Sequence, residues 1–183
     1  ALHLAAAALD PGATEALLEA GADARAANRR GATPLHYACD ARPAAEPDAA
    51  RQAQVLWLLL DAGADVSAPD AGGASPLHRA VRARSPAAVR ALLASRASVT
   101  ARLTKGGTTP LHLAVRSTGA SGTRGALDEQ LAIVELLLDA GADPSAKDAR
   151  GTTPAASARR PPVRALLEAA AAAPAKPSGM IRP

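Results

Sequence analysis

Aromatic residues are nearly missing from this chain of 183 residues, which has one Trp, one Tyr and no Phe. Hydrophobic residues still make up 48% of the sequence, and more than half of them are alanine. A β-sandwich or barrel needs Val, Ile, Tyr and Phe in its core, so the composition disfavours both. Closely packed helices fill space with Ala and Leu, and we therefore expect an all-α fold.

Cysteine and long apolar runs are also scarce. The single Cys39 excludes a disulfide framework and any metal site built from several thiols, and it fits the reducing cytoplasm, where we expect this protein to be. The apolar run Val55 to Leu60 ends at Asp61, far short of the roughly 20 residues that span a membrane. The sequence therefore predicts a soluble protein.

A repeat organises the chain. The dipeptide Leu-His recurs with spacings of 33, 42 and 34 residues, at His3, His36, His78 and His112. Each copy is followed by Leu-Leu, and three of the four copies are then followed by Gly-Ala-Asp. The third copy has Arg96-Ala97-Ser98 instead, and a fifth unit opens at Gly151. These markers define a unit of about 33 residues that is extended in two places.

The shared pattern Asp-x-x-Gly-x-Thr-Pro-Leu-His, followed by a small-residue helix, Val-x-x-Leu-Leu and Gly-Ala-Asp, resembles the ankyrin repeat. The resemblance implies a solenoid of stacked units, each a hairpin loop followed by two antiparallel helices. It predicts one ankyrin repeat domain over residues 1–172, with units over about 1–27, 28–69, 70–102, 103–147 and 148–172. Residues 173–183 are expected to form a flexible tail.

Local signals predict where the helices begin and end. Ser or Thr before Pro favours a helix start, whereas Gly after Leu-Leu favours a helix end in the left-handed conformation. Arg96 takes the place of that glycine in the third unit, at an expected cost of about 1 kcal/mol. We expect helices over residues 2–7, 14–19, 34–39, 48–61, 76–83, 86–94, 110–115, 127–139 and 163–172.

Two insertions, near residues 41–50 and 117–127, are expected between the first and second helices of their units. In the first insertion Asp48 is the expected cap of a lengthened second helix. Residues 117–125 read Ser-Thr-Gly-Ala-Ser-Gly-Thr-Arg-Gly and are expected to be the most mobile internal segment. The fifth unit lacks Leu-His and is predicted to be a degenerate C-terminal cap.

The sequence offers no candidate for catalysis. The four histidines share one position in the repeat, where the resemblance implies hydrogen bonds between a helix start and its hairpin. Cys39 aligns with Val81 and Val115, which predicts a small buried side chain. Phosphate-binding glycine loops and hydrolase or metalloprotease motifs are missing as well. We expect no enzyme activity, no cofactor and no metal.

Two interpretations stay open for each aromatic residue. Tyr37 lies at the groove-side edge of its first helix, where it is either an inter-repeat packing residue or a contact for a partner. Trp57 aligns with the polar Arg90 and Glu135 and should face outward from its second helix. Either the neighbouring insertion folds over it, or it is an exposed anchor.

The resemblance implies that a partner binds the concave face, which consists of the hairpin tips and the groove-facing ends of the first helices. The predicted partner-binding residues are Arg29, Arg30, Tyr37, Asp40, Arg82, Lys105, Arg116 and Arg150. Six of them are basic, in a chain of net charge +4. Either they are ordinary solvated side chains, or they form a basic groove for an acidic or phosphorylated segment.

The sequence thus predicts a non-enzymatic interaction module that binds a protein or peptide, most simply an acidic one, and neither nucleic acid, membrane nor a small-molecule substrate. Only the positive charge suggests nucleic acid as a partner. The two aromatic residues lie far apart in the repeat and provide no pattern for base stacking. The alternative interpretation is a targeting or regulatory segment of a larger enzyme whose catalytic domain lies outside this chain.

Overall fold

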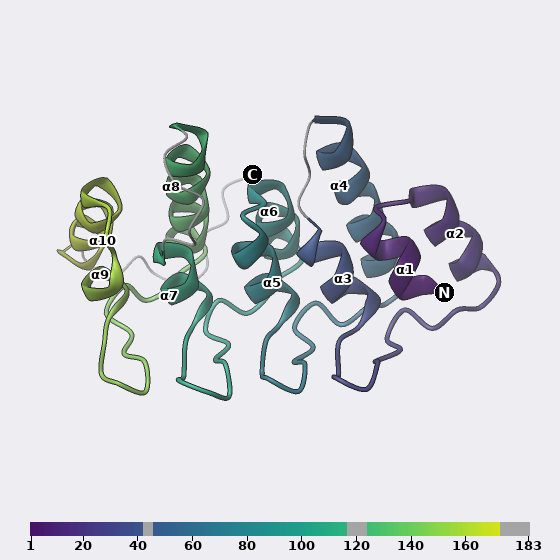
Figure 1. Ribbon diagram of the computed structural model, residues 1–183, viewed down its shortest axis with the longest axis horizontal. Helices are drawn as coiled ribbons and strands as arrows, with labels where there is room; N and C mark the ends of the chain where they lie inside the picture. Colours follow the sequence, from purple (N-terminus) through teal and green to yellow (C-terminus); the bar gives the residue numbers. More distant parts are fainter. Residues whose placement is uncertain (42–45, 117–123, 173–183) are drawn as a thin grey trace.

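Two parallel rows of helices build the molecule (Figure 1). The computed structural model describes residues 1–41, 46–116 and 124–172, and these residues contain helices and no strand. The row of first helices consists of α1 (Leu2–Ala7), α3 (Pro34–Asp40), α5 (Pro76–Ala83), α7 (Pro110–Val115) and α9 (Pro154–Ser157). The row of second helices consists of α2 (Pro11–Glu19), α4 (Glu46–Asp61), α6 (Pro86–Ala94), α8 (Arg124–Asp139) and α10 (Pro161–Ala172).

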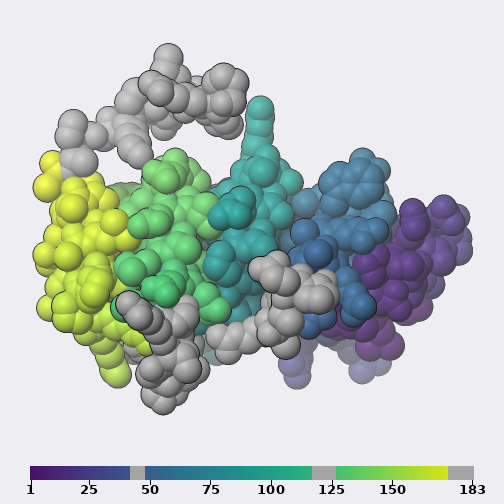
Figure 2. Space-filling model, turned by 90° about the horizontal axis from the view of Figure 1, so that it is seen from above, coloured from purple at the N-terminus to yellow at the C-terminus, as the bar shows by residue number. Residues whose placement is uncertain are grey.

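Each helix contacts its counterpart in the next unit. In one row α1 packs against α3, α3 against α5, α5 against α7 and α7 against α9, while the same succession runs from α2 to α10 in the other row. The hairpin loops project together from the side of the first helices (Figure 1), and the units follow one another along the long axis when seen from above (Figure 2). The expected all-α solenoid of stacked helix pairs is confirmed.

The predicted capping signals act as expected. The side chains of Ser75, Thr109 and Thr153 accept hydrogen bonds from backbone N–H groups in the first turns of α5, α7 and α9. The glycines after Leu-Leu adopt positive φ, for example +84° at Gly21. Arg96 takes the same conformation with φ +63°, which confirms the predicted departure in the third unit.

Several helix starts were predicted too late, and one helix was missed. Helix α2 begins at Pro11 and not at residue 14, because the carboxylate of Asp10 accepts from Ala13 N–H at 3.0 Å. Helix α10 begins at Pro161, since proline is tolerated in a first turn. Helix α9 was not predicted because its unit lacks Leu-His, yet Thr153 and Pro154 form a helix start there.

The insertions lie between first and second helices as predicted, and they extend α4 and α8 toward their N-termini. Helix α4 begins at Glu46, so Asp48 lies inside the helix and the prediction that it caps the helix is wrong. Helix α8 begins at Arg124, before the predicted residue 127. Residues 42–45, 117–123 and 173–183 lie outside the described residues. The predictions of a mobile loop and a flexible tail concern these residues.

A continuous core of small and branched side chains separates the two rows. Leu35, Leu77 and Leu111 of the first helices are at most 1% exposed, as is Cys39, so the predicted burial of this cysteine is confirmed. Burial raises the pKa of the Cys39 thiol, which keeps it protonated and unreactive. Trp57 is 62% exposed on α4 and is not covered, and its role as an anchor stays a prediction.

Backbone hydrogen bonds join the tips of neighbouring hairpins. Ala71 N–H donates to Arg30 O, Thr104 N–H to Gly72 O, and Ala149 N–H to Gly106 O, each at 2.9 Å. Inside three hairpins one Asn or Asp oxygen accepts two backbone N–H groups, as Asp70 Oδ1 does from Gly72 and Ala74. These bonds fix both the shape of each tip and the distance between tips.

The hairpin of the fourth unit closes differently because Leu103 occupies the position of Asp70. Leu103 N–H donates to Thr108 O, one residue further along than the equivalent bond from Asp70 to Ala74. The extra residue accounts for the spacing of 34 between His78 and His112. Arg102 Nη1 donates to Gly107 O at 2.9 Å and to Lys147 O at 2.8 Å, which secures this hairpin without a carboxylate.

A buried glutamine ties the two helices together in each extended unit. Gln52 Nε2 donates to Ala38 O and Ala41 O at 2.9 Å, and Ser85 Oγ–H of the next unit donates to Gln52 Oε1 at 2.7 Å. Gln130 Nε2 likewise donates to Ala114 O at 2.8 Å. The buried Gln130 Oε1 has no hydrogen-bond partner among the described residues. The residue that corresponds to Ser85, before the first proline of α10, is Arg160.

Replacing Gly73 by alanine is expected to lower the free energy of unfolding by about 2 to 5 kcal/mol. The residue has φ +76°, and an added Cβ would lie 2.7 Å from the backbone nitrogen of Thr104. Gly151 is the matched control, since it has φ +73° in the last hairpin and open space around it. Gly151→Ala should cost only the strain, about 1 to 2 kcal/mol. Equal losses for the two variants in urea unfolding would contradict the close contact between hairpins.

Replacing Arg160 by serine is expected to raise the free energy of unfolding by about 1 to 2 kcal/mol. The hydroxyl would cap α10 and would stand where Ser85 stands relative to Gln52, within reach of the unpaired Gln130 Oε1. Urea unfolding measures the gain. In a chain that also carries Gln130→Leu, Arg160→Ser should raise the free energy of unfolding only by what the helix cap contributes. An equally large increase in this background would refute the contact with the glutamine.

Candidate functional site

Every histidine of the repeat joins two units through its ring. His36 Nδ1 accepts from Thr33 N–H at 3.1 Å, so its Nε2 carries the proton and donates to Ala74 O of the next hairpin at 2.9 Å. His78 and His112 make the same contacts, with Nε2 donating over 3.3 and 3.0 Å to the next hairpin. His3 Nε2 donates to Ala32 O at 3.0 Å. The predicted structural role of the histidines is confirmed.

Burial favours the neutral form of two of these rings, those of His36 and His78. Burial lowers the pKa of His36, and the positive charge of nearby Arg79 acts in the same direction against the bond to Ala74 O. Burial also lowers the pKa of His78. A second proton, on Nδ1, would point at the N–H group of Thr33 or Ser75, and that N–H group would lose its hydrogen-bond acceptor. Both rings therefore serve the fold and are not poised for proton transfer.

Tyr37 packs between the first and second units. Its hydroxyl accepts from Asn28 Nδ2 at 3.0 Å, and its ring meets the edge of His3 with centroids 5.3 Å apart at 88°. The side chain is only partly buried. Of the two interpretations of Tyr37, inter-repeat packing is confirmed, while its role as a partner contact stays a prediction.

An ion-pair network occupies the concave face between the second and third units. Asp40 accepts from Arg79 Nη1 at 2.7 Å and from Arg82 Nη2 at 2.7 Å. Arg79 Nη2 also pairs with Asp70. Burial alone would raise the pKa of Asp70, but hydrogen bonds from Arg79 and from the Ala74 and Gly72 N–H groups outweigh it and lower the pKa. Arg82 is therefore neutralised by a carboxylate of its own chain.

The sequence alone did not predict this network, because its residues meet only when the units stack. Asp40, Arg82 and Arg116 each lie six residues after the first proline of their helices, so the stack places Asp40 beside Arg82 and Arg82 beside Arg116. Arg79 lies one turn before Arg82 on α5 and links Asp40 to the hairpin residue Asp70. Comparing equal repeat positions in successive units is the signal that would have revealed these pairs.

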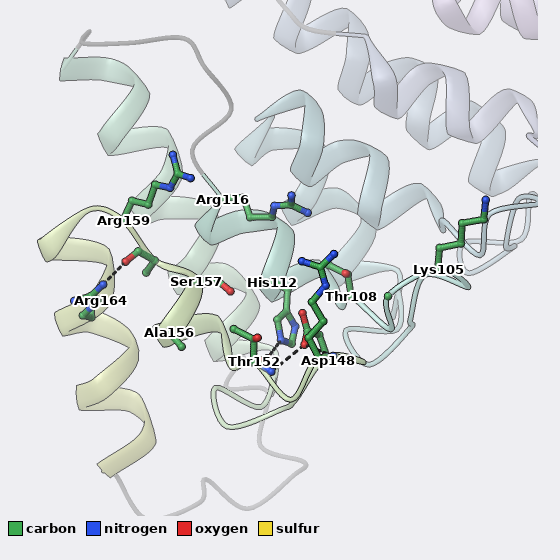
Figure 3. Close-up of a pocket in the computed structure, with 13 residues that line it drawn as sticks. Lys105, Thr108, His112, Arg116, Asp148, Thr152, Ala156, Ser157, Arg159 and Arg164 are labelled. Atoms are coloured by element: carbon green, nitrogen blue, oxygen red, sulfur yellow. Dashed lines mark hydrogen bonds between the residues drawn. The ribbon is translucent and has the colours of Figure 1, made fainter.

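A groove of about 710 Å³ opens between the fourth and fifth units (Figure 3). Three predicted site residues line it, Lys105 and Arg150 from the hairpin tips and Arg116 from the end of α7. Arg159, between α9 and α10, and Arg164, in the first turn of α10, also line it. The other lining residues are Gly106, Thr108, His112, Asp148, Thr152, Ala156, Ser157 and Ala158. Arg29, Arg30 and Arg82 do not line this groove.

The groove holds five cations and one carboxylate. None of the five forms an ion pair with any described residue, although Arg164 Nη2 donates to Ala158 O at 2.8 Å. Asp148 Oδ1 accepts from the N–H groups of Arg150 and Thr152 at 2.9 Å, and these bonds lower its pKa. Asp148 closes its hairpin and interacts with the nearby charge of Arg150, so it offsets part of the positive charge of the groove and leaves an excess of cations. Arg159 and Arg164 were missed because the fifth unit was interpreted as a degenerate cap.

Other kinds of site find little support in the described part of the chain. Residues 1–41, 46–116 and 124–172 contain no cluster of three or more His, Cys, Asp or Glu side chains that could hold a metal ion. None of the helices described there is long and apolar enough to cross a membrane. The groove at the fourth and fifth units is thus the most distinctive candidate site.

Comparison with protein families gives one match. Residues 44–148 match a family model described as ankyrin repeats in three copies. The match covers more than half of the chain, from the region of α4 to the last hairpin, and it ends before α9 and α10. A comparison with curated proteins gives no match.

The free energy of unfolding should decrease as the pH falls below 6.5. Because His36 and His78 have lowered pKa values in the folded state, the unfolded chain binds their protons first. The stability that the two neutral rings contribute is fully present above pH 6.5, the ordinary pKa of histidine. It is lost as the pH falls toward the pKa values of the folded state, by up to about 1.4 kcal/mol per pH unit for each ring. Asp70, with a lowered pKa, adds a loss only below its ordinary 3.8.

Urea unfolding at pH 7.5, 6.5 and 5.5 measures this decrease. The control is His78→Gln, which should be less stable at pH 7.5 but should lose less stability between pH 7.5 and 5.5 than the natural chain. A free energy of unfolding that stays constant over this range would contradict the neutral, buried rings.

Proposed function

Because the chain belongs to the ankyrin-repeat family, we propose that it is a non-enzymatic module that binds an acidic protein or peptide segment through its concave face. Ankyrin repeats are generally protein–protein interaction modules and are typically non-catalytic. We assign this role to a domain over residues 1–172. We place the protein in the cytoplasm, because its cysteine, Cys39, is a free thiol.

One observation carries the proposal of an acidic partner, namely the groove between the fourth and fifth units. Lys105, Arg116 and Arg150 come from three different segments and gather there with no ion-pair partner among the described residues. If these cations were ordinary solvated side chains, nothing would require them to gather in one recess. Like charges in a concave site reinforce one another's potential and attract a partner of opposite charge.

The same groove argues against nucleic acid as the partner. Single strands are usually held by aromatic side chains on which bases stack, and neither aromatic residue of the chain lines the groove. Tyr37 is engaged with His3 and Asn28 at the other end of the solenoid. A protein segment with acidic side chains needs only the cations, hydroxyls and backbone groups that line this recess.

Site-specific photo-crosslinking tests whether the concave face binds a partner. A photo-reactive residue replaces Ala156, which lines the groove, or Glu135, which is exposed on α8 of the other row. In extract from the native source, the Ala156 position should capture a protein whose cross-linked segment is rich in Asp, Glu or phosphate. Capture of the same protein from the Glu135 position alone would refute concave-face binding.

Charge reversal in the groove should slow association with the captured partner. Arg116→Glu with Arg150→Glu is expected to reduce the association rate at low salt at least about tenfold, because steering by several charges contributes that much. The unfolding free energy should change little, since neither guanidinium makes an ion pair with a described residue. Arg51→Glu with Arg90→Glu changes the net charge equally on the second helices and should leave the rate nearly unchanged. Equal slowing by both double variants would point to general charge attraction and contradict the groove.

A further inference from the structure

The chain itself contains an example of an anion held on its concave face. Between the second and third units, the Asp40 carboxylate accepts hydrogen bonds at 2.7 Å from two guanidinium groups, those of Arg79 and Arg82. Both arginines come from α5, while Asp40 comes from the end of α3. At this interface two carboxylates of the chain, Asp40 and Asp70, neutralise the charges of both arginines.

Among the described residues, no carboxylate stands at the groove in the repeat position of Asp40. Arg116 stands at the end of α7, in the repeat position that Asp40 occupies at the end of α3. The substitution removes a carboxylate and adds a guanidinium, so Arg116, Arg159 and Arg150 line the recess without a counter-ion of the Asp40 kind. Figure 3 places Arg116 above His112 and Asp148 at this recess, with Lys105 extending from the neighbouring hairpin.

The charge of the groove exceeds what one carboxylate neutralises. Five cations face a single carboxylate, Asp148, whose Oδ1 is already engaged by two backbone N–H groups. A phosphate monoester carries a charge of roughly −1.5 to −2 and three acceptor oxygens, and it forms strong hydrogen bonds with several guanidinium groups at once. The hydroxyls of Ser157 and Thr108 line the same recess and are further potential donors.

The size and lining of the groove favour a phosphorylated side chain on a peptide. Its volume of about 710 Å³ exceeds what a single phosphate fills, which leaves room for the residues on either side of it. The apolar lining consists of small side chains such as Ala156 and Ala158. It includes no Phe, Tyr or Trp, and the ring of His112 is only 2% exposed, so the base of a nucleotide has no platform to stack on. A phosphoserine or phosphothreonine within an extended segment meets these conditions.

We infer that the groove between the fourth and fifth units binds a phosphorylated serine or threonine of a protein segment, with Arg116 and Arg150 as its main contacts. The inference rests on the proposed function, because it assumes that the concave face binds a protein segment. It adds that binding depends on phosphorylation of that segment. Arg159 and Lys105 widen the positive field around the phosphate.

Peptide libraries test the inference directly. Three libraries share random flanking residues and carry phosphoserine, glutamate or serine at the centre, and each is passed over the immobilised full chain at physiological salt. The phosphoserine library should be retained at least about tenfold more strongly than the glutamate library, and the serine library should not be retained. An excess of inorganic phosphate should weaken retention without replacing the need for a peptide.

Two variants with equal loss of charge locate the binding. Arg116→Ala with Arg150→Ala should reduce phosphoserine retention at least tenfold, and Arg51→Ala with Arg90→Ala, at exposed positions of the second helices, should change it less than twofold. Thermal unfolding should remain similar in both, because the groove pair forms no ion pair with a described residue and the exposed ion pair of Arg51 with Asp48, at 3.8 Å, contributes little. Equal losses in the two variants would overturn the assignment to the groove.

The outcomes separate this inference from the proposed function. Equal retention of glutamate and phosphoserine libraries, both lost in the groove variant, would overturn the phosphate inference and leave acidic binding by the concave face intact. Retention of no library would also overturn it, while photo-crosslinking at Ala156 decides the proposed function independently. Capture of anionic phospholipid vesicles in preference to the phosphoserine library would assign the groove to a membrane surface and refute a phosphorylated protein segment.

Discussion

The stacking of the units depends on one interaction, the hydrogen bond from a histidine Nε2 to a carbonyl of the next hairpin. It occurs at His3, His36, His78 and His112, over 2.9 to 3.3 Å. Because the ring reaches the carbonyl only when the next hairpin stands in the correct position, each ring fixes the register of the following unit. The bonds between hairpin tips then keep this register along the solenoid. Side chains from equal repeat positions consequently come together on one face, which is why charges distant in sequence meet there.

The irregular parts of the repeat leave this register intact. Both insertions extend α4 and α8, second helices that lie in the row away from the hairpins. Gln52 and Gln130 fasten these longer helices to the carbonyl ends of α3 and α7. The extra residue in the fourth hairpin is accommodated because Arg102 bonds to Gly107 O within this hairpin and to Lys147 O of the next unit. Extra length is therefore confined to places where it does not change the order of the first helices.

Features repeated in every unit could be predicted from the sequence, and features of a single unit could not. Leu-His and the capping residues before proline recur, so the all-α solenoid and most of its helices were predictable. Helix α9 was missed because the fifth unit has lost Leu-His, and Arg159 and Arg164 were missed with it. The pairing of Arg82 with Asp40 was missed because it requires two units to be stacked in a known register. The predicted basic face is therefore uneven, neutralised at the third unit and open at the fourth and fifth.

This unevenness suggests how a repeat fold acquires a binding site without new architecture. At the end of a first helix, aspartate pairs with arginines of the next unit and makes an internal contact, as Asp40 does. Arginine at the same position, as at Arg116, leaves cations that an external anion must satisfy. The fifth unit departs from the repeat, and its short α9 is followed by Arg159, which lines the same recess. The proposed site thus arises where a charge change inside the array meets a unit that departs from the repeat.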